Sequence, residues 1–426
     1  MRLTILHTND IHGRAEAIAR IATLVRREKE SSGHRVIYLD AGDVEETTNR
    51  LSSLTKGTAM HRLLSLTTCD AAAVGNACWL RYGPAVLEEH ARVSSYPQLL
   101  GNFGGLRGPV PSVLLGDVGV FGLTAGLQHF VGSIDVGFEW LDIRETAVAQ
   151  ARGLREAGAE LVVCLSHLGL SDPQEPWDDR RLAPELSGLV DIVIGGHTHD
   201  LLPEGEWIAG VLVAHAGSFG EHVGRIEVDG GTITASVEAI PDDIEPWPGI
   251  AEEEARIELE TAAALAEEIG VLQEPLDAQG IAEILRLRME AEIGLFLEGQ
   301  TLAVVPAGPV RRGTLWDASE SAANPGVTRM TGSQLADLLE RAADEEFMAA
   351  TPRPLRGRRR GRLMVAGLDP AALEPSREYI VAGTDFELEP YGGYAQAEWG
   401  LEVHYDFPTI VREAVEQYLV SGVIWT

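Results

Sequence analysis

The stretch LTILHTNDIHG, residues 3–13, begins with apolar and β-branched residues and ends with polar ones. Its apolar part has the length and composition of a buried β-strand. Asp10 and His12 follow directly and are two residues apart, a spacing that lets both side chains reach one point when the chain turns. Carboxylate and imidazole groups bind divalent metal ions in proteins. The stretch therefore predicts a strand with a metal-binding turn at its carboxyl end.

Four later stretches repeat this pattern of a short apolar run followed by polar residues. They are RVIYLDAGD (35–43), AAAVGN (71–76), ELVVCLSH (160–167) and DIVIGGH (191–197). Residues 16–30 and 145–158, which lie between these runs, carry apolar side chains at helical spacing. Strands that alternate with helices predict an α/β domain, in which binding sites gather at the carboxyl ends of the strands.

The polar residues at these strand ends form a candidate metal site. Considered alone, a histidine such as His167 is more often a loop or core residue, and Asn76 is typical of a turn. The GGHTH stretch at 195–199 is more specific, because two histidines flanked by glycines have little use in packing. Together the strand ends predict a site for Mn²⁺, Fe, Zn²⁺ or Ni²⁺ that contains Asp10, His12, Asp43, Asn76, His167, His197 and His199.

The charge of the chain restricts its partners. Among 426 residues, 65 are acidic and 34 are Lys or Arg, which gives a formal net charge of −31. This negative field argues against a nucleic-acid polymer or an anionic membrane, whereas a small anion can bind where a metal ion reverses the charge locally. No apolar stretch is long enough to cross a bilayer and the opening residues leave no room for a cleavable signal, so we expect a cytoplasmic protein.

The length predicts two domains, and a change of composition suggests where they meet. Residues 1–240 contain the strand ends described above. Residues 241–270 contain ten acidic residues and one arginine, and they open with prolines and continue as a helical run, as expected of a linker and a solvated connecting helix. Residues 271–426 form the second domain, and the basic run at 353–363 within it is interpreted as a solvated loop rather than a polyanion clamp.

The motifs D-x-H, G-D, G-N, a lone His and G-H-x-H, in this order, resemble those of the calcineurin-like metallophosphoesterases. The opening and the two-domain length are similar to the 5′-nucleotidase branch, which includes UDP-sugar hydrolases, 2′,3′-cyclic-nucleotide phosphodiesterases and thiosulfohydrolases. The resemblance implies an α/β fold: an N-terminal β-sandwich flanked by helices, followed by an α+β domain of the 5′-nucleotidase C-terminal type.

The resemblance also implies two divalent metal ions bridged by Asp43. Asp10, His12 and His199 would complete one ion's ligands, and Asn76, His167 and His197 those of the other. The implied reaction is hydrolysis of a phosphate mono- or diester of a small molecule, nucleotide or related, by a hydroxide that bridges the metals. Asp43, Asn76 and His167 would then be catalytic. The alternative is a protein that holds metal and binds a phosphorylated ligand without turnover.

The stretch GNACWLRYG, residues 75–83, departs from the family pattern G-N-H-E-x-D. Ala77 stands in place of the histidine that contacts the phosphoryl group, Cys78 in place of the glutamate, and Leu80 in place of the aspartate. Arg81 is a candidate replacement that would contact the phosphate, although an arginine in a loop is more often simply solvated. A weakened enzyme is therefore compatible with the sequence.

The second domain departs from the pattern as well. The family's N-G-G-G-I-R motif corresponds to residues 297–302, where Leu297 and Leu302 replace its Asn and Arg. The stretch TDFELEPYGGYAQ, residues 384–396, keeps the later pattern, and Phe386, Tyr391 and Tyr394 are its candidates for substrate binding. An aromatic ring beside glycines is at least as often a packing residue. The sequence gives no indication of the oligomeric state.

Overall fold

The structure is a computed structural model that describes residues 2–126, 137–172, 175–319, 321–350, 359–368 and 372–421. The chain forms two compact units, Met1–Glu260 and Thr261–Thr426. The point of division lies within the stretch 241–270. The domain limits drawn from the sequence remain a prediction, and each unit is described by itself.

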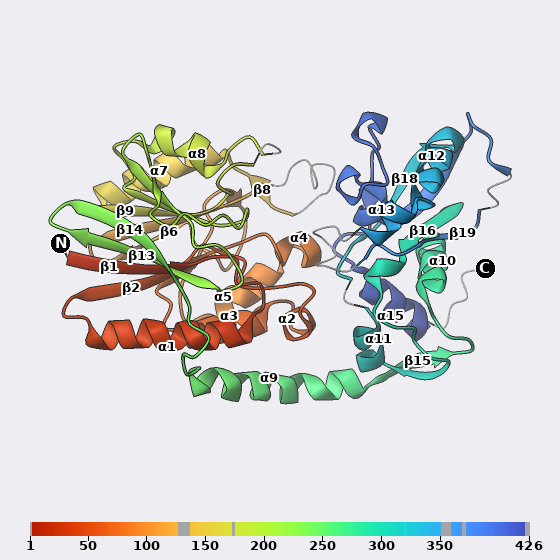
Figure 1. The fold of residues 1–426 in the computed structure, drawn as a ribbon, viewed down its shortest axis with the longest axis horizontal. Coiled ribbons are helices and arrows are strands. Elements are labelled where there is room, and N and C mark those ends of the chain that lie inside the picture. Colours follow the sequence, from red (N-terminus) through yellow and green to blue (C-terminus); the bar gives the residue numbers. More distant parts are fainter. Residues whose placement is uncertain are drawn as a thin grey trace. The chain divides into compact units, whose positions relative to one another are not determined.

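The first unit contains two six-stranded sheets (Figure 1). The first sheet has the order β14 (Thr232–Ala239), β13 (His222–Asp229), β1 (Arg2–Thr8), β2 (Arg35–Asp40), β3 (Ala71–Ala73) and β4 (Gln98–Leu99). The second has the order β11 (Glu206–Ile208), β12 (Val211–Ala214), β10 (Ile192–Gly195), β9 (Leu161–His167), β7 (Val118–Thr124) and β6 (Ser112–Leu115). Strands β1 to β4 are parallel, as are β7, β9, β10 and β12, so their carboxyl ends share an edge within each sheet.

The two sheets pack face to face around a shared apolar core. Alternate side chains of a strand point to opposite faces, so Leu3 and Ile5 of β1 enter this core while Leu6 faces the helices outside. Strand β9 behaves in the same way, with Val163 in the shared core and Cys164 on the outer side. Because both faces of each sheet are buried, the strands read as continuous apolar runs in the sequence.

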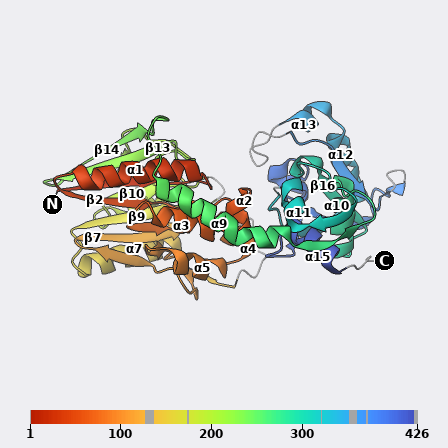
Figure 2. The same cartoon turned by 90° about the horizontal axis from the view of Figure 1, so that it is seen from below.

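Helices cover the outer face of each sheet (Figures 1 and 2). The first sheet packs against α1 (Ala15–Ser31), α3 (Thr58–Ser65) and α9 (Pro248–Ala266), and the second against α7 (Ile143–Glu156) and η1 (Ala183–Leu186). The predicted β-sandwich flanked by helices is thus confirmed. Among its described residues, this unit also contains α2 (Arg50–Leu54), α4 (Trp79–Tyr82), α5 (Val86–Val93), β5 (Phe103–Gly104), β8 (Glu139–Trp140) and α8 (Asp179–Leu182).

The second unit is built on a five-stranded mixed sheet, which confirms the predicted α+β class. Its order is β19 (Leu363–Ala366), β16 (Ile293–Leu297), β20 (Glu378–Thr384), β18 (Pro325–Thr331) and β21 (His404–Tyr405). A two-stranded sheet pairs β15 (Glu268–Leu272) with β17 (Gly308–Arg311). The helices are η2 (Glu298–Gln300), α10 (Ala278–Arg288), α11 (Arg312–Ala318), α12 (Gly332–Ala342), α13 (Glu345–Ala349), α14 (Asp385–Leu388), η5 (Pro390–Gly392), η6 (Ala397–Trp399) and α15 (Val411–Ser421).

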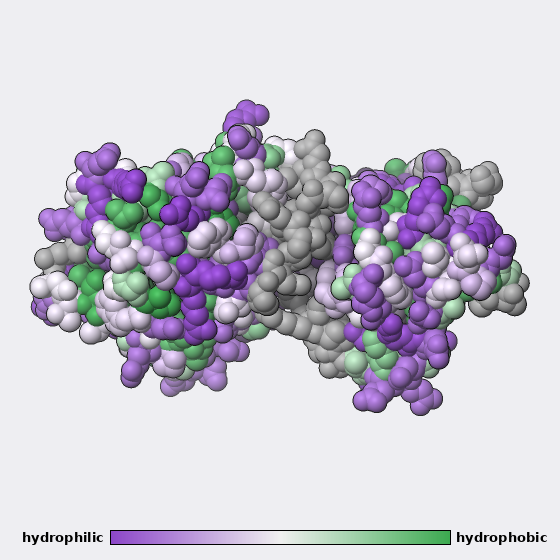
Figure 3. Space-filling model, turned by 90° about the horizontal axis from the view of Figure 1, so that it is seen from above, coloured by the Kyte–Doolittle hydropathy of each residue, from purple (hydrophilic) through white to green (hydrophobic). Residues whose placement is uncertain are grey.

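The face drawn in Figure 3 carries hydrophilic and hydrophobic residues side by side. Scattered apolar residues are normal on a protein surface and indicate no binding site by themselves. None of the helices in the described ranges has both the length and the apolar character needed to span a bilayer.

Helix α9 packs on the first unit through one face only. Substitutions on its buried and exposed faces can therefore measure how much this packing contributes to stability. Ile257 is fully buried in the core beneath α1 and α3, whereas Leu259, two residues later, is 77% exposed. We expect Ile257→Ala to lower the free energy of unfolding by about 2–5 kcal/mol, because it leaves a cavity, and Leu259→Ala to change it by less than about 0.5 kcal/mol. Urea unfolding followed by fluorescence measures both. Equal midpoints for the two variants would contradict the packing of α9 described here.

Candidate metal centre

All seven predicted ligands lie together where the carboxyl ends of the two parallel strand sets meet. Strands β1, β2 and β3 of the first sheet present Asp10 with His12, Asp43 and Asn76. Strand β9 of the second sheet ends at His167, and β10 is followed by His197 and His199. The site is therefore shared by both layers of the sandwich.

One cluster of donor atoms forms around Asp10, His12 and His199. The Nε2 atoms of His12 and His199 are 3.0 Å apart. Asp10 Oδ1 lies 3.6 Å from His12 Nε2 and 3.4 Å from His199 Nε2. Asp10 is fully buried and His12 is 7% exposed. Two imidazole nitrogens and a carboxylate oxygen thus converge on one small volume, the arrangement that a divalent ion requires.

A second cluster, formed by Asp10, Asp43 and His167, adjoins the first. His167 Nε2 lies 3.3 Å from Asp43 Oδ2 and 3.9 Å from Asp10 Oδ1. Asn76 Oδ1 extends this cluster, because it lies 3.2 Å from His167 Nε2 and 2.8 Å from His197 Nδ1. The carbonyl oxygen, carboxylates and imidazoles form a continuous set of oxygen and nitrogen donors.

The backbone adopts an uncommon conformation at five of the seven residues. Asp10, His12, Asp43, His197 and His199 all have positive φ, between 49° and 72°. Residues other than glycine avoid this left-handed region, which costs on the order of 1–3 kcal/mol each at such positions, although Asp and His tolerate it better than most. Tight turns of this kind bring side chains two residues apart to the same point.

Neighbouring groups orient the donors. His167 donates a hydrogen bond from Nδ1 to the carbonyl of Ala41 at 2.8 Å, which leaves its Nε2 facing Asp43. Asn9 donates from Nδ2 to Asp10 Oδ2 at 2.7 Å, and the N–H of His197 donates to the same oxygen at 2.9 Å. Such hydrogen bonds fix the orientation of metal ligands.

The electrostatics of the site favour cations. Burial by itself would raise the pKa of Asp10 and Asp43, but the adjacent histidines hold both below the usual range. Burial opposes protonation of His167, yet Asp43 and Asp10 raise its pKa to about 10. The site therefore attracts protons when it has no other cation. A divalent ion can take their place, so the donor set fits a metal.

Glu46 is a neighbour of the site that the sequence did not single out. Its Oε2 atom lies 3.6 Å from His12 Nδ1, and the side chain is 2% exposed. Its N–H donates to Ser52 Oγ and its Oε1 accepts from the N–H of Thr48, so the loop after β2 holds it in place. The available signal was the pair of adjacent glutamates, Glu45 and Glu46, that follows Asp43.

The divergent stretch 75–83 contributes structure to the site. The N–H of Ala77 donates to Asp43 Oδ1 at 2.9 Å, and the Ala77 side chain is half-buried. Cys78 is buried, and burial together with the charge of Glu45 raises the pKa of its thiol, which keeps it protonated. Trp79 is fully buried against Phe103 and begins α4. Arg81 lies in α4 and is half-buried, and its contact with substrate remains a prediction.

The three aromatic candidates of the second unit differ in exposure. Tyr394 has no exposed surface, and its ring packs edge-on against Phe347 with the ring centroids 5.0 Å apart. Its ring is therefore a packing residue of the core and offers no open face for stacking. Tyr391 is 43% exposed, and Phe386 is half-buried 6.0 Å from it. Substrate binding by the three aromatic residues remains a prediction. Of the three, Tyr391 and Phe386 have ring surface that a substrate could reach in this structure.

The position of the family's Asn is occupied by a core residue here. Leu297 is 1% exposed, and its N–H donates to Glu387 Oε1 at 2.8 Å. Gln300 donates to the same oxygen at 2.9 Å, and Thr384 donates to Oε2. Leu302, in the position of the Arg, is 47% exposed. A buried hydrogen-bond network has thus replaced the motif.

One residue of the basic run does not behave as a solvated loop residue. Residues 353–358 of the run lie outside the described ranges. Arg360 is 8% exposed, lies over the ring of Phe347 at 3.7 Å, and donates from Nη2 to the carbonyl of Gly392 at 2.9 Å. The interpretation of this run as solvated is therefore wrong at Arg360, because an arginine can stack on aromatic rings inside a fold.

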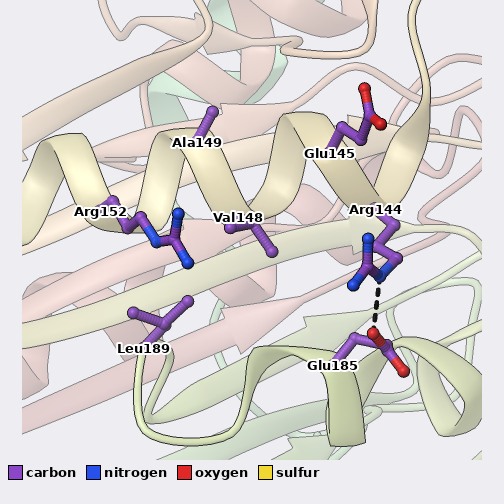
Figure 4. A pocket seen from close by; sticks show the side chains of 7 residues that line it. All are labelled: Arg144, Glu145, Val148, Ala149, Arg152, Glu185 and Leu189. Carbon is purple, nitrogen blue, oxygen red and sulfur yellow. Dashed lines mark hydrogen bonds and ion pairs between the residues drawn. The ribbon is translucent and has the colours of Figure 1, made fainter.

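A shallow pocket lies away from these clusters, on the outer face of the second sheet between α7 and η1 (Figure 4). The pair of Arg144 and Glu185, 2.6 Å apart, spans its edge. None of the predicted site residues lines it, so it offers no support for catalysis. Its lining residues are Arg144, Glu145, Val148, Ala149, Arg152, Glu185 and Leu189.

Comparison with known proteins gives a consistent assignment. Residues 3–201 match the calcineurin-like phosphoesterase family, and residues 276–398 match the 5′-nucleotidase C-terminal domain. The chain is 26% identical over 404 residues to the uncharacterized metallophosphoesterase YunD of Bacillus subtilis, covering 86% of this chain and 84% of that protein. It is 27% identical over 272 residues to a snake venom 5′-nucleotidase of Gloydius brevicauda, covering 53% of this chain and 45% of the venom protein.

The fold is also that of solved 5′-nucleotidases. The 5′-nucleotidase precursor from Thermus thermophilus superposes with a TM-score of 0.62 at 21% identity, covering 99% of this chain and 96% of that one. The chain therefore combines a calcineurin-like phosphoesterase domain with a 5′-nucleotidase C-terminal domain, and its relatives with these domains are hydrolases. Calcineurin-like phosphoesterases use divalent metals, which agrees with the clustered donors.

The close approach of two loops at Asp43 gives a test of the ligand set. A Cβ atom at Gly75 would lie 2.0 Å from Asp43 Oδ1 and 2.4 Å from Asp43 N, so Gly75→Ala must displace the carboxylate. We expect metal affinity to fall about 10- to 100-fold, measured by calorimetric titration of the metal-free protein with Mn²⁺ or Zn²⁺. Gly153→Ala, where a Cβ meets nothing within 4 Å, is the control. Unchanged affinity in Gly75→Ala would remove Asp43 from the ligands.

The network around Glu387 predicts a pH dependence of stability. Burial raises the pKa of Glu387 to about 7, above the ordinary value of 4.5 that applies in the unfolded chain. The folded state then holds a proton that the unfolded state releases, so this stabilising contribution is present below pH 4.5 and is lost as pH rises through 7, at up to about 1.4 kcal/mol per pH unit. The denaturant midpoint of unfolding should therefore fall as pH rises from 4.5 to 7 in the exposed control Glu340→Gln. In Glu387→Gln, which cannot titrate at this position, the midpoint should fall less over the same range. Parallel curves would refute this assignment.

Proposed function

We propose that the protein hydrolyses a phosphate mono- or diester of a small molecule, a nucleotide or a related compound, with two divalent ions held by the seven residues of the candidate metal centre. The observation that carries this proposal is the convergence of all seven nitrogen and oxygen donors at one edge of the sandwich. Divalent ions bound there would supply Lewis acidity, which neutralises phosphate charge and makes a water molecule a stronger nucleophile.

The protein's own residues would position these components. The carboxylate of Asp43 is fixed at both oxygens, because Oδ2 faces His167 and Oδ1 accepts a hydrogen bond from the N–H of Ala77. Asp10 belongs to both donor clusters. Asn76 presents its carbonyl oxygen between His167 and His197. A donor set fixed in this way needs little rearrangement when substrate arrives, which is how enzyme sites achieve electrostatic stabilisation.

A nucleotide-like substrate is supported less directly. The venom relative is named a 5′-nucleotidase, and the C-terminal domain type is the same. Tyr391 and Phe386 supply exposed or half-exposed aromatic surface in the second unit. Leu297 and Leu302, however, cannot make the polar contacts of the family's Asn and Arg. We therefore assign the substrate class by its phosphate ester and treat the nucleotide as the first group to screen.

A second candidate function is binding of a phosphorylated ligand without turnover. Ala77 and Leu80 favour it, because neither side chain can act as a general acid or donate a hydrogen bond to the phosphoryl group. Retention of all seven donors favours turnover, because a binder needs no such set of ions. The balance supports an enzyme whose rate depends mainly on the metals.

An activity screen tests the proposal. Metal-free protein reconstituted with Mn²⁺, Zn²⁺, Fe²⁺ or Ni²⁺ should hydrolyse at least one of p-nitrophenyl phosphate, its bis-ester, and a panel of nucleotides and nucleotide sugars. Asp43→Asn removes a shared donor and should abolish the activity, while Gly153→Ala should retain it. If protein shown to bind the ions hydrolyses no substrate with any of the metals, the proposal is refuted. The second candidate, binding of a phosphorylated ligand without turnover, would then stand.

The missing dyad provides a gain-of-function prediction. The Ala77 N–H lies 2.9 Å from Asp43 Oδ1, so a side chain at residue 77 begins beside the metal cluster. We expect Ala77→His combined with Leu80→Asp to raise kcat by about 10²- to 10³-fold on p-nitrophenyl phosphate, because it restores an oriented hydrogen-bond donor. Leu80→Asp alone should give no gain. A double variant no faster than wild type would mean that this protein works by a different scheme.

A further inference from the structure

A second group of metal-binding side chains lies outside the candidate metal centre. It consists of Glu45 in the loop after β2, His61 on α3 and His90 on α5, and is called the buried triad here. The exposed fractions are 5% for Glu45, 5% for His61 and 0% for His90. None of the three belongs to the seven predicted ligands, and the proposed reaction makes no use of them.

The donor atoms of the buried triad face one another. Glu45 Oε1 lies 2.6 Å from His61 Nε2 and 3.3 Å from His90 Nδ1, and the two imidazole rings are 4.4 Å apart between centroids. All three donor atoms lie within 4.8 Å of one another. Two ligands of one tetrahedral zinc ion lie about 3.3 Å apart, so His90 Nδ1 already has this spacing from Glu45, whereas His61 Nε2, at hydrogen-bond distance, would move outward by several tenths of an ångström to admit an ion.

The hydrogen bonds of His90 determine which nitrogen can act as a ligand. Its Nε2 lies 2.6 Å from the carbonyl oxygen of Lys56. A carbonyl only accepts hydrogen bonds, so Nε2 carries the proton and the neutral ring has its lone pair on Nδ1. Nδ1 has no hydrogen-bond partner in the described part of the chain, and it points toward the oxygen of Glu45. A lone pair buried against a carboxylate requires a cation between them, which is either a proton or a metal ion.

The outer side of His61 is held in the way that metal ligands are held. Its Nδ1 lies 2.8 Å from the hydroxyl of Tyr96, which can accept the Nδ1 proton and so leave the lone pair on Nε2, facing Glu45. The side-chain amide of Gln98, 3.0 Å from Nδ1, accepts the same proton when its oxygen rather than its nitrogen faces the ring. Burial lowers the pKa of His61, so its ring is an inefficient source of positive charge for the carboxylate. Hydrogen bonds to the far nitrogen orient an imidazole toward a metal and increase its basicity.

The fold closes tightly over the buried triad. Gly57 has a φ of 91°, and a Cβ there would lie 2.7 Å from His90 Nε2 and 2.9 Å from Cys78 Sγ. Only glycine lets the chain take this conformation and this approach. Solvent cannot neutralise Glu45 in so enclosed a place, and a buried unpaired charge is strongly destabilising.

We propose that Glu45, His61 and His90 bind a structural divalent ion, zinc by the type of its ligands, separate from the candidate metal centre. One carboxylate oxygen and two imidazole nitrogens form a three-donor set that suits Zn²⁺. The ion neutralises Glu45, fills the position in front of His90 Nδ1 and ties α3 and α5 to the loop that carries Asp43 and Glu46. Because the site is enclosed, the ion enters as the chain folds and leaves only when it unfolds.

The alternative is a proton shared between Glu45 and a histidine, and ion counting distinguishes the two. Protein produced with zinc in the medium is dialysed against a chelator under native conditions, which empties open sites, and is then unfolded in guanidinium chloride with a chromogenic chelator. We expect wild type to release about one zinc ion per chain on unfolding, His90→Gln to release none, and the exposed control His404→Gln to match wild type. Release of equal amounts from wild type and folded His90→Gln, or of none from wild type, would overturn the proposal.

A second variant covers the case in which His90→Gln does not fold. Asp10→Asn combined with Asp43→Asn disables the candidate metal centre and leaves the buried triad intact. After the same dialysis it should still release about one zinc ion per chain, and zinc X-ray absorption should show nitrogen and oxygen neighbours with imidazole scattering. No retained ion, or a spectrum without imidazole, would overturn the proposal. Neither readout depends on hydrolysis, so failure of the proposed function leaves this test unaffected.

Discussion

The left-handed backbone at Asp10, His12, Asp43, His197 and His199 is the constraint on which the metal centre depends. Each such residue is conformationally unfavourable, and the turns also bring carboxylates and imidazoles into mutual contact. The sandwich core stabilises this arrangement, because strands that are apolar on both faces hold five loop ends in register. Separated from the two sheets, these turns would not persist.

The negative net charge of the chain is compatible with the anionic substrate proposed for it, because cations bound at the metal centre would change the sign of the local field. The net charge of −31 repels anions at long range. Within the metal centre the histidines hold the pKa of Asp10 and Asp43 low, and these two carboxylates hold the pKa of His167 high. The same arrangement that attracts protons attracts divalent cations, and these reverse the local field. The protein's own charge and its proposed chemistry are therefore compatible.

The divergent stretch 75–83 has a structural role in this fold. Trp79 fills the core, Cys78 stands beside the buried triad, and the N–H of Ala77 holds Asp43. Loss of the family's dyad therefore leaves the metal donors in place. Hydrolytic ability would then rest on the ions, with Glu46 as an additional acidic neighbour of His12.

The sequence by itself determined the α/β class, the five strand ends and the seven donors, because short apolar runs followed by metal-binding residues are local patterns. It did not reveal Glu46, the buried triad or Arg360, since Glu45, His61 and His90 are separated along the chain and share no motif. It also left Tyr394 open between substrate binding and packing, whereas the tertiary structure buries it. Contacts between distant elements depend on how layers pack, which periodicity and spacing along one chain do not specify.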